Sequence, residues 1–307
     1  MIDGGSQPMT TVGNGEYTYE LIESWAKLPA GETFGMVSAV ATDSQDRVYA
    51  FQRKDPPIVV FNRDGSYVGS WGLGAITNPH GIFIKDDIVY VTDREDSVCL
   101  RFTLDGKPLQ VIGERGVHSD TGCEVPGTLV PRAAGPFNYP AELVPSPWGD
   151  MYVADGYRNA RVHRFAANGQ LKASWGEPGK GGANQFHLVH SMMVGADDLL
   201  YVCDRENNRI QIFDRDGEFV GMWTDLLRPM DISQSPDGVF CISEGGNDAR
   251  QGHTEDTDSR ISLMNKEGTL LARWIIRGGH GSWIDANGDI YVGVPDGVGV
   301  DKFVRQG

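Results

Sequence analysis

A unit of about 40 residues recurs along the chain, and it restricts the possible folds more than any other feature of the sequence. Each copy holds a strand with a Tyr-Val type of core, a polar loop, an alternating strand, an Asp-Gly type of turn and a strand that usually ends in Trp. The six first halves are marked by Tyr49, Tyr90, Tyr152, Tyr201, Phe240 and Tyr291, and the five endings by Trp71, Ile112, Trp175, Trp223 and Trp274. One ending is therefore missing.

The missing ending stands at the front of the chain. Residues 19–25 (Tyr-Glu-Leu-Ile-Glu-Ser-Trp) read like the last strand of a repeat with nothing before it, whereas the chain stops near Phe303, one strand short. This displacement predicts an all-β, six-bladed β-propeller with four strands per blade, in which the N-terminal strand completes the last blade. Closing the ring pairs the edge strands that would otherwise template aggregation. A β-solenoid is the structural alternative, but its repeats are shorter and it needs no displaced strand.

The composition agrees with one domain. Forty glycines and sixteen prolines are spread evenly, as in a β protein with many tight turns, and no segment reads as a linker. We expect residues 1–16 to be a flexible N-terminal segment and residues 17–307 to be a single propeller domain. The four cysteines have no metal-type spacing, so we expect reduced and mostly buried thiols.

The net charge of −15 narrows the possible partners. An acidic surface repels phosphate backbones and anionic lipid headgroups, which disfavours nucleic acid and membrane surfaces. We expect a small-molecule substrate, while the oligomeric state stays open. The first residues show neither a basic region nor an apolar one of the secretory type, so we expect a cytoplasmic protein.

Three histidines share one position of the repeat, at the start of the first strand in alternate blades. They are His80 in blade two, His190 in blade four and His280 in blade six, while the other blades carry Ser38 or Ala39, Ala141 and Met230 there. In a six-fold ring this register predicts three imidazoles in a near three-fold arrangement, which suits a metal with an open fourth position, as in catalytic zinc sites. A single histidine would more simply hydrogen-bond inside a polar channel. Three of only seven histidines at one position favour the metal.

The remaining histidines share no such position. We interpret His118, His163, His187 and His253 as surface, loop or hydrogen-bonded structural residues.

The end of the second strand lies on the same face as the histidines and supplies charged residues. Arginines there can bind a carboxylate bidentately, which makes Arg53 and Arg205 candidates, and Arg94 and Arg158 are further arginines whose contribution stays open. Positive charge near a phenol favours its ionised form, so Tyr157 is a candidate base, although most propeller tyrosines serve packing. We expect the carboxylates at these strand ends to cap loops or pair with arginines; they are Asp93, Asp155 and Asp204.

The repeats resemble NHL-type propellers, and four segments are more specific. Residues 79–82 (Pro-His-Gly-Ile), 154–161 (Ala-Asp-Gly-Tyr-Arg-Asn-Ala-Arg), 190–191 (His-Ser) and 204–210 (Asp-Arg-Glu-Asn-Asn-Arg-Ile) resemble the peptidyl-α-hydroxyglycine α-amidating lyase family. The resemblance covers nearly the whole chain. It implies a zinc-dependent lyase that cleaves an N-acyl carbinolamide into an amide and glyoxylate or another aldehyde.

The resemblance also implies residue roles. His80, His190 and His280 would hold the zinc, Tyr157 would accept the proton of the carbinol hydroxyl, and Arg53 and Arg205 would neutralise a carboxylate or developing charge. The family's structural calcium is held by two backbone carbonyls, which map to Val40 and Ile82, and by an aspartate directly after the third histidine. That position is Gly281 here, which argues against calcium.

The context implied for the reaction differs from that of the animal members, which are secreted and disulfide-bonded. The chain shows neither feature and carries no hydroxylase domain, so we expect a small N-(α-hydroxyalkyl)amide of bacterial-style catabolism, with or without a carboxylate. Two other functions stay open: a zinc-dependent hydrolase of a small amide, ester or lactone, and a non-catalytic NHL interaction propeller. Two insertions, residues 114–136 and 245–259, are either walls of the site or solvated surface loops.

Overall fold

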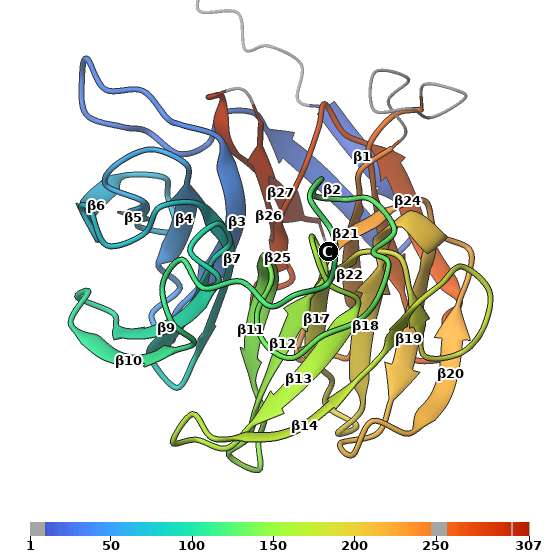
Figure 1. Cartoon of the computed structure of the whole chain (residues 1–307). Helices are drawn as coiled ribbons and strands as arrows, with labels where there is room; N and C mark the ends of the chain where they lie inside the picture. The colour runs from blue at the N-terminus through green and yellow to red at the C-terminus, as the bar shows by residue number, and fades with distance from the viewer. Residues whose placement is uncertain (1–9, 247–256, 296, 307) are drawn as a thin grey trace, which may run out of the picture.

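Each repeat folds into one antiparallel sheet, and the sheets stand around a central channel as the blades of a propeller (Figure 1). The computed structural model describes residues 10–246, 257–295 and 297–306. Within these residues the chain forms six blades, which confirms the six-bladed all-β propeller predicted from the repeat. No helix of the described residues has the length and apolar character needed to cross a bilayer.

The strands occupy equivalent places in each blade. The innermost strands, which contact one another around the channel, are β3 (Val37–Thr42), β7 (Pro79–Lys85), β11 (Pro140–Pro145), β17 (Val189–Val194), β21 (Pro229–Gln234) and β25 (Ser282–Ile284). The second strands are β4 (Val48–Gln52), β8 (Ile88–Asp93), β12 (Met151–Asp155), β18 (Leu200–Asp204), β22 (Phe240–Glu244) and β26 (Ile290–Val294).

The outer strands complete the sheets. The third strands are β5 (Ile58–Phe61), β9 (Val98–Thr103), β13 (Arg161–Phe165), β19 (Arg209–Phe213), β23 (Arg260–Met264) and β27 (Gly299–Arg305). The fourth strands are β6 (Tyr67–Trp71), β10 (Pro108–Ile112), β14 (Leu171–Trp175), β20 (Phe219–Trp223), β24 (Leu270–Ile275) and, in blade six, β2 (Tyr17–Ile22). A short parallel pair, β15 (Glu177–Pro178) and β16 (Gln185–Phe186), and the 3₁₀ turn η1 (Arg205–Asn207) lie outside this pattern.

The recurrence of Trp and Asp-Gly has a packing cause. Gly106 and Gly217 lie in turns with φ of +84° and +89°, a region that favours glycine. A Cβ atom on Gly106 would lie 2.8 Å from the Trp71 ring, and one on Gly217 would lie 2.7 Å from the Trp175 ring. The turn of one blade therefore packs against the Trp that ends the preceding blade, which is why both features recur with the same period.

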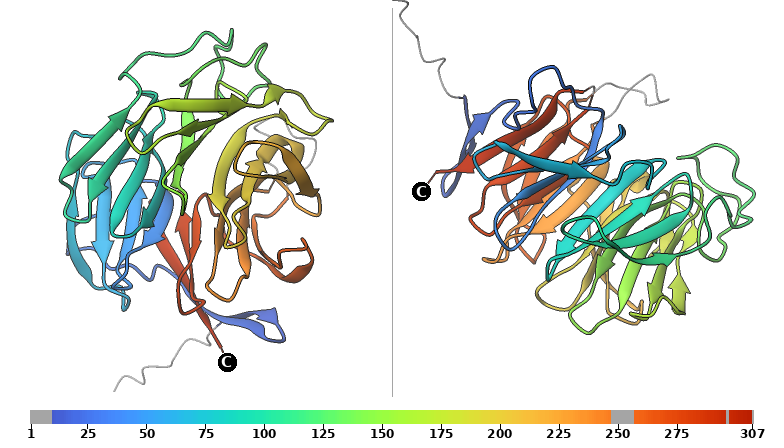
Figure 2. Two further views of the ribbon diagram at one scale, coloured as in Figure 1. Left: turned by 90° about the horizontal axis from the view of Figure 1, so that it is seen from below. Right: turned by 90° about the vertical axis from the view of Figure 1, so that its left-hand side faces the viewer.

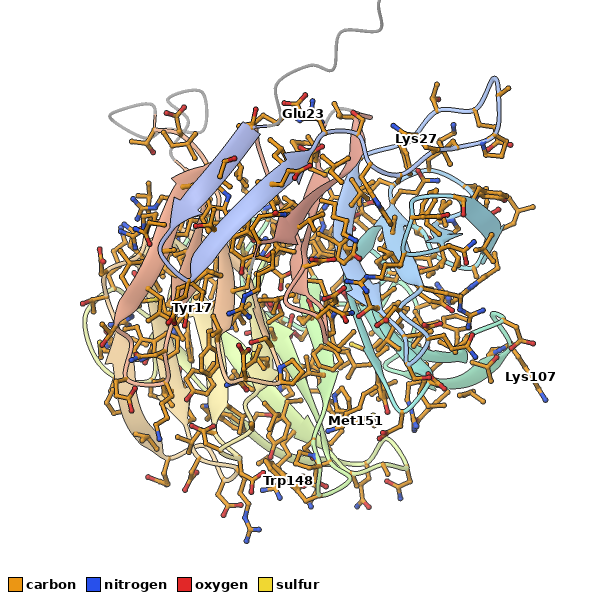
Figure 3. All side chains as sticks on the ribbon, turned by 180° about the vertical axis from the view of Figure 1, so that it is seen from behind. Tyr17, Glu23, Lys27, Lys107, Trp148 and Met151 are labelled. Carbon is orange, nitrogen blue, oxygen red and sulfur yellow. The ribbon has the colours of Figure 1, made fainter. Side chains whose placement is uncertain are left out.

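The two ends of the chain close the ring as the displaced strand predicts. Strand β2 pairs antiparallel with β27, with Tyr19 opposite Arg305 and Leu21 opposite Phe303. Figure 2 shows the blue N-terminal hairpin beside the red C-terminal strands, and Figure 3 shows the same hairpin from behind with Tyr17 at its turn.

The last blade differs from the prediction of four strands. Residues Thr10–Asn14 form β1, which pairs with β2 and gives this blade the order β1-β2-β27-β26-β25. A tight turn with φ of +53° at Gly15 folds the chain back, and Val12 packs against the blade's apolar core. Residues 10–16 of the expected flexible segment therefore form a strand and the turn that follows it, and residues 1–9 lie outside the described residues.

Closure of blade six depends on Tyr19, whose ring is fully buried with its centroid 5.1 Å from that of Trp274. We expect Tyr19→Ala to lower the free energy of unfolding by about 3–5 kcal/mol, because it leaves a large cavity at the seam. Tyr19→Phe is the matched control and should cost less than about 1 kcal/mol, because the buried hydroxyl has no hydrogen-bond partner within the described residues. Urea denaturation followed by tryptophan fluorescence measures both. Equal losses in the two variants would contradict this account of the seam.

The cysteines and insertions can be placed as well. All four cysteines are free and buried, which confirms the expectation of reduced thiols. Residues 114–136 connect β10 to β11, between blades two and three. The second insertion connects β22 to β23 within blade five, and its residues 247–256 lie outside the described residues.

Candidate metal centre

The three histidines of the shared repeat position meet in the channel. All are buried, and their candidate ligand atoms lie within 4.8 Å of one another. The ring centroids are 4.9 Å apart for His80 and His190, and 4.8 Å apart for each of the other two pairs. The cluster is thus close to an equilateral triangle, as alternate blades of a six-fold ring require.

A β-bulge turns these side chains toward the channel. The pairing between the first and second strands shifts register at this repeat position in five blades, for example between Pro79 and Ile82 and between Val189 and Ser191. Such bulges bend a strand and re-aim a side chain. In blade six His280 lies just before β25, and its backbone N–H donates to the Gly293 carbonyl at 3.2 Å.

Each imidazole is fixed by a backbone carbonyl of the next blade. The Nδ1 atoms of the histidines face these carbonyl oxygens: His80 faces Ala141 at 2.8 Å, His190 faces Met230 at 2.5 Å, and His280 faces Ser38 at 2.7 Å. A carbonyl can only accept, so Nδ1 carries the proton and Nε2 presents a lone pair. Metal-binding histidines are held in this way, because the outer hydrogen bond sets the tautomer and the ring orientation.

The surroundings keep the imidazoles neutral. Burial, followed by the charge of Arg53, lowers the pKa of His280 to about 3. Burial is also the main reason why the pKa of His80 and that of His190 lie well below the ordinary value. Neutral imidazole is the form that binds a metal.

The donor set fits a zinc-type ion. The Nε2 atoms of His80 and His190 share one phenol, which can donate a single proton, so this pair holds more lone pairs than the phenol can satisfy. Three imidazoles with a further open position are the ligand set of catalytic zinc sites. His80, His190 and His280 can therefore hold such an ion together.

Tyr157 lies directly at this cluster, two residues beyond the end of β12. Its hydroxyl is 3.0 Å from Nε2 of His80 and 2.9 Å from Nε2 of His190, and the residue is 8% exposed. The backbone carbonyl of Tyr157 accepts a hydrogen bond of 2.7 Å from the Gly127 N–H in the insertion 114–136. That insertion is thus attached to the back of a site residue, which favours a wall of the site over a solvated loop.

The two candidate arginines lie beside the histidines in different ways. Arg205 begins η1, is buried, and donates to the Tyr157 hydroxyl at 3.4 Å and to Glu206 at 2.8 Å. Arg53 follows β4 and donates from Nε to the carbonyl of Pro79 at 3.1 Å. The structure therefore brings Arg53, Arg205, Tyr157 and the histidines together, while their catalytic roles stay predictions.

Arg94 and Arg158, which the sequence left open, differ in their positions. The Cζ atom of Arg94 lies 4.8 Å from the centroid of the Tyr157 ring. Arg158 instead donates to the Cys123 carbonyl at 2.8 Å and lies over Tyr139, so it supports the insertion.

The strand-end carboxylates are structural, as expected. Asp93 accepts hydrogen bonds from the backbone of Thr77 and Asn78, at 2.7 and 2.9 Å. Asp155 accepts from the Asn138 backbone and lies 3.1 Å from Nε2 of the buried His163. The third, Asp204, accepts from the His187 backbone and the Arg209 side chain.

The other histidines lie outside the cluster. His118 is exposed and bonds Ser97 at 2.8 Å, His163 is buried in blade three, and His187 is half-buried. His253 lies outside the described residues.

Two carboxylates, one buried and one partly buried, line the same cavity as the histidines, and the sequence reasoning missed them. Glu142 and Asp231 stand one residue after Ala141 and Met230, at the repeat position that holds Gly281 in blade six. An aspartate has no room at 281, where a Cβ atom would lie 2.5 Å from the Ala39 Cα. Carboxylate oxygens are preferred ligands of hard cations, so Glu142 and Asp231 could hold one.

The environments of these two carboxylates differ. Asp231 accepts hydrogen bonds from the Ser191 hydroxyl at 2.7 Å and from the Ser282 backbone at 2.9 Å, and burial still raises its pKa to about 6. The Oε1 atom of Glu142 has no partner within the described residues, and burial, followed by the Asp231 charge, raises the pKa of Glu142 well above 4.5. The expectation that calcium binds poorly, if only the carbonyls of Val40 and Ile82 hold it, stays a prediction.

The raised pKa of Glu142 gives a testable pH dependence. An acidic group whose pKa is higher in the folded state than in the unfolded state contributes its full stabilisation to the folded protein below the pKa of the unfolded state. This contribution is lost as the pH rises through the pKa of the folded state. In metal-free protein we expect Glu142→Gln to raise the free energy of unfolding at pH 8 by about 1–3 kcal/mol, with a smaller gain at pH 5. Urea titrations in EDTA at both pH values measure this. A difference from wild type that does not change with pH would contradict it.

Comparisons with known proteins agree with this architecture. A model of the NHL repeat matches residues 186–213, which contain His190 and Arg205. The structure titled "Streptogramin B lyase structure" has the same fold, with a TM-score of 0.63 at 13% identity over 98% of this chain and 100% of that chain.

Two curated relatives are more similar in sequence. NHL repeat-containing protein 3 of Homo sapiens is 32% identical over 241 residues, which cover 73% of this chain and 66% of that protein. Peptidyl-alpha-hydroxyglycine alpha-amidating lyase 1 of Drosophila melanogaster is 30% identical over 155 residues, which cover 47% of this chain and 26% of that protein. The alignments thus span less than two thirds of each relative. This chain contains an NHL repeat, and NHL-repeat proteins and peptidyl-α-hydroxyglycine α-amidating lyases are among its relatives.

Proposed function

We propose that this protein is a zinc-dependent lyase that cleaves the C–N bond of an N-acyl carbinolamide of the α-hydroxyglycine type. The observation that carries the proposal is the Tyr157 hydroxyl, held within 3.0 Å of two of three convergent imidazoles. A base directly beside a metal-binding set is the arrangement that proton removal from a metal-bound alcohol needs. The similarity to amidating lyases supports the same reaction class.

His80, His190 and His280 would hold the zinc. When bound, the ion supplies Lewis-acid stabilisation for negative charge on the carbinol oxygen. The carbonyls that face the three Nδ1 atoms keep the rings oriented, so little reorganisation is needed on loading.

Tyr157 moves the proton. Its phenolate oxygen takes the hydrogen of the carbinol hydroxyl, the C–O bond becomes a C=O bond, and the C–N electron pair leaves with the nitrogen. The proton then passes from the Tyr157 hydroxyl to that nitrogen, so the products are a primary amide and glyoxylate, with no water consumed. The Arg205 Nη1, 3.4 Å from the Tyr157 oxygen, stabilises the phenolate that is present before the first transfer and restored by the second.

Arg53 fits a different task. It lies beside the histidines, because its charge contributes to the lowered pKa of His80 and His280, and its guanidinium is partly exposed. A guanidinium binds a carboxylate through two parallel hydrogen bonds. We assign it the carboxylate next to the carbinol carbon.

The test uses zinc-loaded protein and N-benzoyl-α-hydroxyglycine in water enriched in ¹⁸O, with early sampling because aldehydes exchange their oxygen. The lyase predicts equimolar benzamide and glyoxylate and no ¹⁸O in the benzamide. Benzoate carrying ¹⁸O would instead identify a hydrolase. If the protein binds no stoichiometric metal and cleaves neither the carbinol C–N bond nor the benzoyl amide bond, the non-catalytic interaction propeller would be the remaining explanation.

A further inference from the structure

Arg94 occupies in blade two the repeat position that Arg205 occupies in blade four. Each follows the aspartate that ends the second strand, Asp93 in β8 and Asp204 in β18. The Cζ atoms of both arginines lie over the ring of Tyr157, at 4.8 Å for Arg94 and 5.5 Å for Arg205. Arg94 is therefore as close to the Tyr157 ring as Arg205 is, although it approaches the ring from a different blade.

The charge of Arg94 is poorly balanced. Its Nη2 reaches Glu95 at 3.3 Å, and the Glu95 side chain is 44% exposed, so this pair is weak. Its Nε is buried and has no hydrogen-bond partner within the described residues, while the side chain as a whole is 15% exposed. A buried donor of a cation without an acceptor is costly, and a carboxylate oxygen would satisfy it.

The nearby guanidinium of Arg53 also lacks a carboxylate partner within the described residues. Among the residues that the structure describes, no salt bridge involves Arg53, whose Nε donates only to a backbone carbonyl. Burial, and then the charge of Arg94, lowers the pKa of Arg53, which shows that the two cations repel each other. In a chain of net charge −15, this local excess of positive charge favours a ligand with more than one negative group.

We propose that Arg94 binds a second carboxylate of the substrate, on its acyl part, so that the preferred substrates are N-acyl carbinolamides whose acyl chain ends in a carboxylate. This inference rests on the proposed function, in which Arg53 binds the carboxylate next to the carbinol carbon. Two separate guanidiniums then bind two separate carboxylates, each with the fork geometry that arginine offers.

The experiment compares N-glutaryl- with N-valeryl-α-hydroxyglycine, two acyl groups of equal length that differ in the terminal carboxylate. We expect wild type to have a kcat/KM about 10- to 100-fold higher for the glutaryl compound, the range of one charge-assisted hydrogen-bonded pair. Arg94→Gln should bring the ratio of the two values near one, and Arg94→Lys should give an intermediate ratio. Arg158→Gln is the matched control and should keep the wild-type ratio, because Arg158 holds the insertion instead.

A binding measurement separates this inference from the proposed function. In calorimetric titrations of metal-free protein, wild type should bind glutarate at least 10-fold more tightly than Arg94→Gln does. If neither carbinolamide is turned over, the proposed lyase activity fails, and the glutarate titration alone decides on Arg94. A wild-type ratio below two, a ratio that Arg94→Gln leaves unchanged, or equal glutarate binding by both proteins would overturn the inference.

Discussion

Replacing His190 with Ala is expected to reduce zinc affinity by more than about 100-fold and to abolish turnover of α-hydroxyglycine amides. The loss should be this large because His190 supplies one of three ligand atoms and also holds the Tyr157 hydroxyl at 2.9 Å. Metal content after gel filtration, measured by mass spectrometry, and glyoxylate release measure the two effects.

His118→Ala is the control for this variant, since His118 is exposed and its side chain hydrogen-bonds Ser97, away from the three histidines. It should retain one zinc per chain and wild-type turnover. An unfolded His190→Ala would be revealed by circular dichroism, and His190→Gln, which keeps more of the side-chain volume, then repeats the test. Wild-type turnover in a folded variant without zinc would contradict the metal-dependent lyase.

Tyr157→Phe is expected to lower kcat by about 10²- to 10⁴-fold while the protein keeps its metal. The substitution removes the proton acceptor but leaves the three imidazoles and their carbonyl partners in place. Steady-state kinetics combined with metal analysis of the same sample distinguishes this result from loss of the site.

Tyr139→Phe provides the comparison, because the Tyr139 ring packs beside Tyr157 and lies under Arg158, and the substitution keeps that ring. We expect its kcat to stay within about three-fold of wild type, because the described hydrogen bonds of Tyr139 involve its backbone and not its hydroxyl. A Tyr157→Phe variant with undiminished kcat would assign the proton transfer to another group.

The fold could be predicted because its causes lie in local and periodic signals. Asp-Gly turns, Tyr-Val cores and terminal Trp residues each recur once per blade, and packing of Trp71 on Gly106 shows why they recur together. The additional strand β1 could not be predicted, because Thr10–Asn14 matches no part of the repeat. Its place follows from a tight turn and from the free edge that β2 offers.

The histidine cluster could also be predicted, since three identical side chains at one register position are visible in the sequence. Glu142 and Asp231 could not be predicted, because the residues at their repeat position differ from blade to blade, with Gly281 in blade six, and so form no recurring pattern. The contact of the insertion 114–136 with Tyr157 depends on a single backbone hydrogen bond from Gly127, which no pattern of side chains reveals. Such contacts between distant loops require coordinates.

The hydrogen bond from His280 to the Ser38 carbonyl joins the last blade to the first, across 242 positions of the sequence. The three imidazoles therefore reach their final relative orientation only when the ring is complete, and under the proposed function metal loading would report on ring closure. A chain that is still being synthesised has two of the three imidazoles long before His280 emerges. Full coordination then becomes available only after nearly all of the protein has been made, which links metal acquisition to the end of folding.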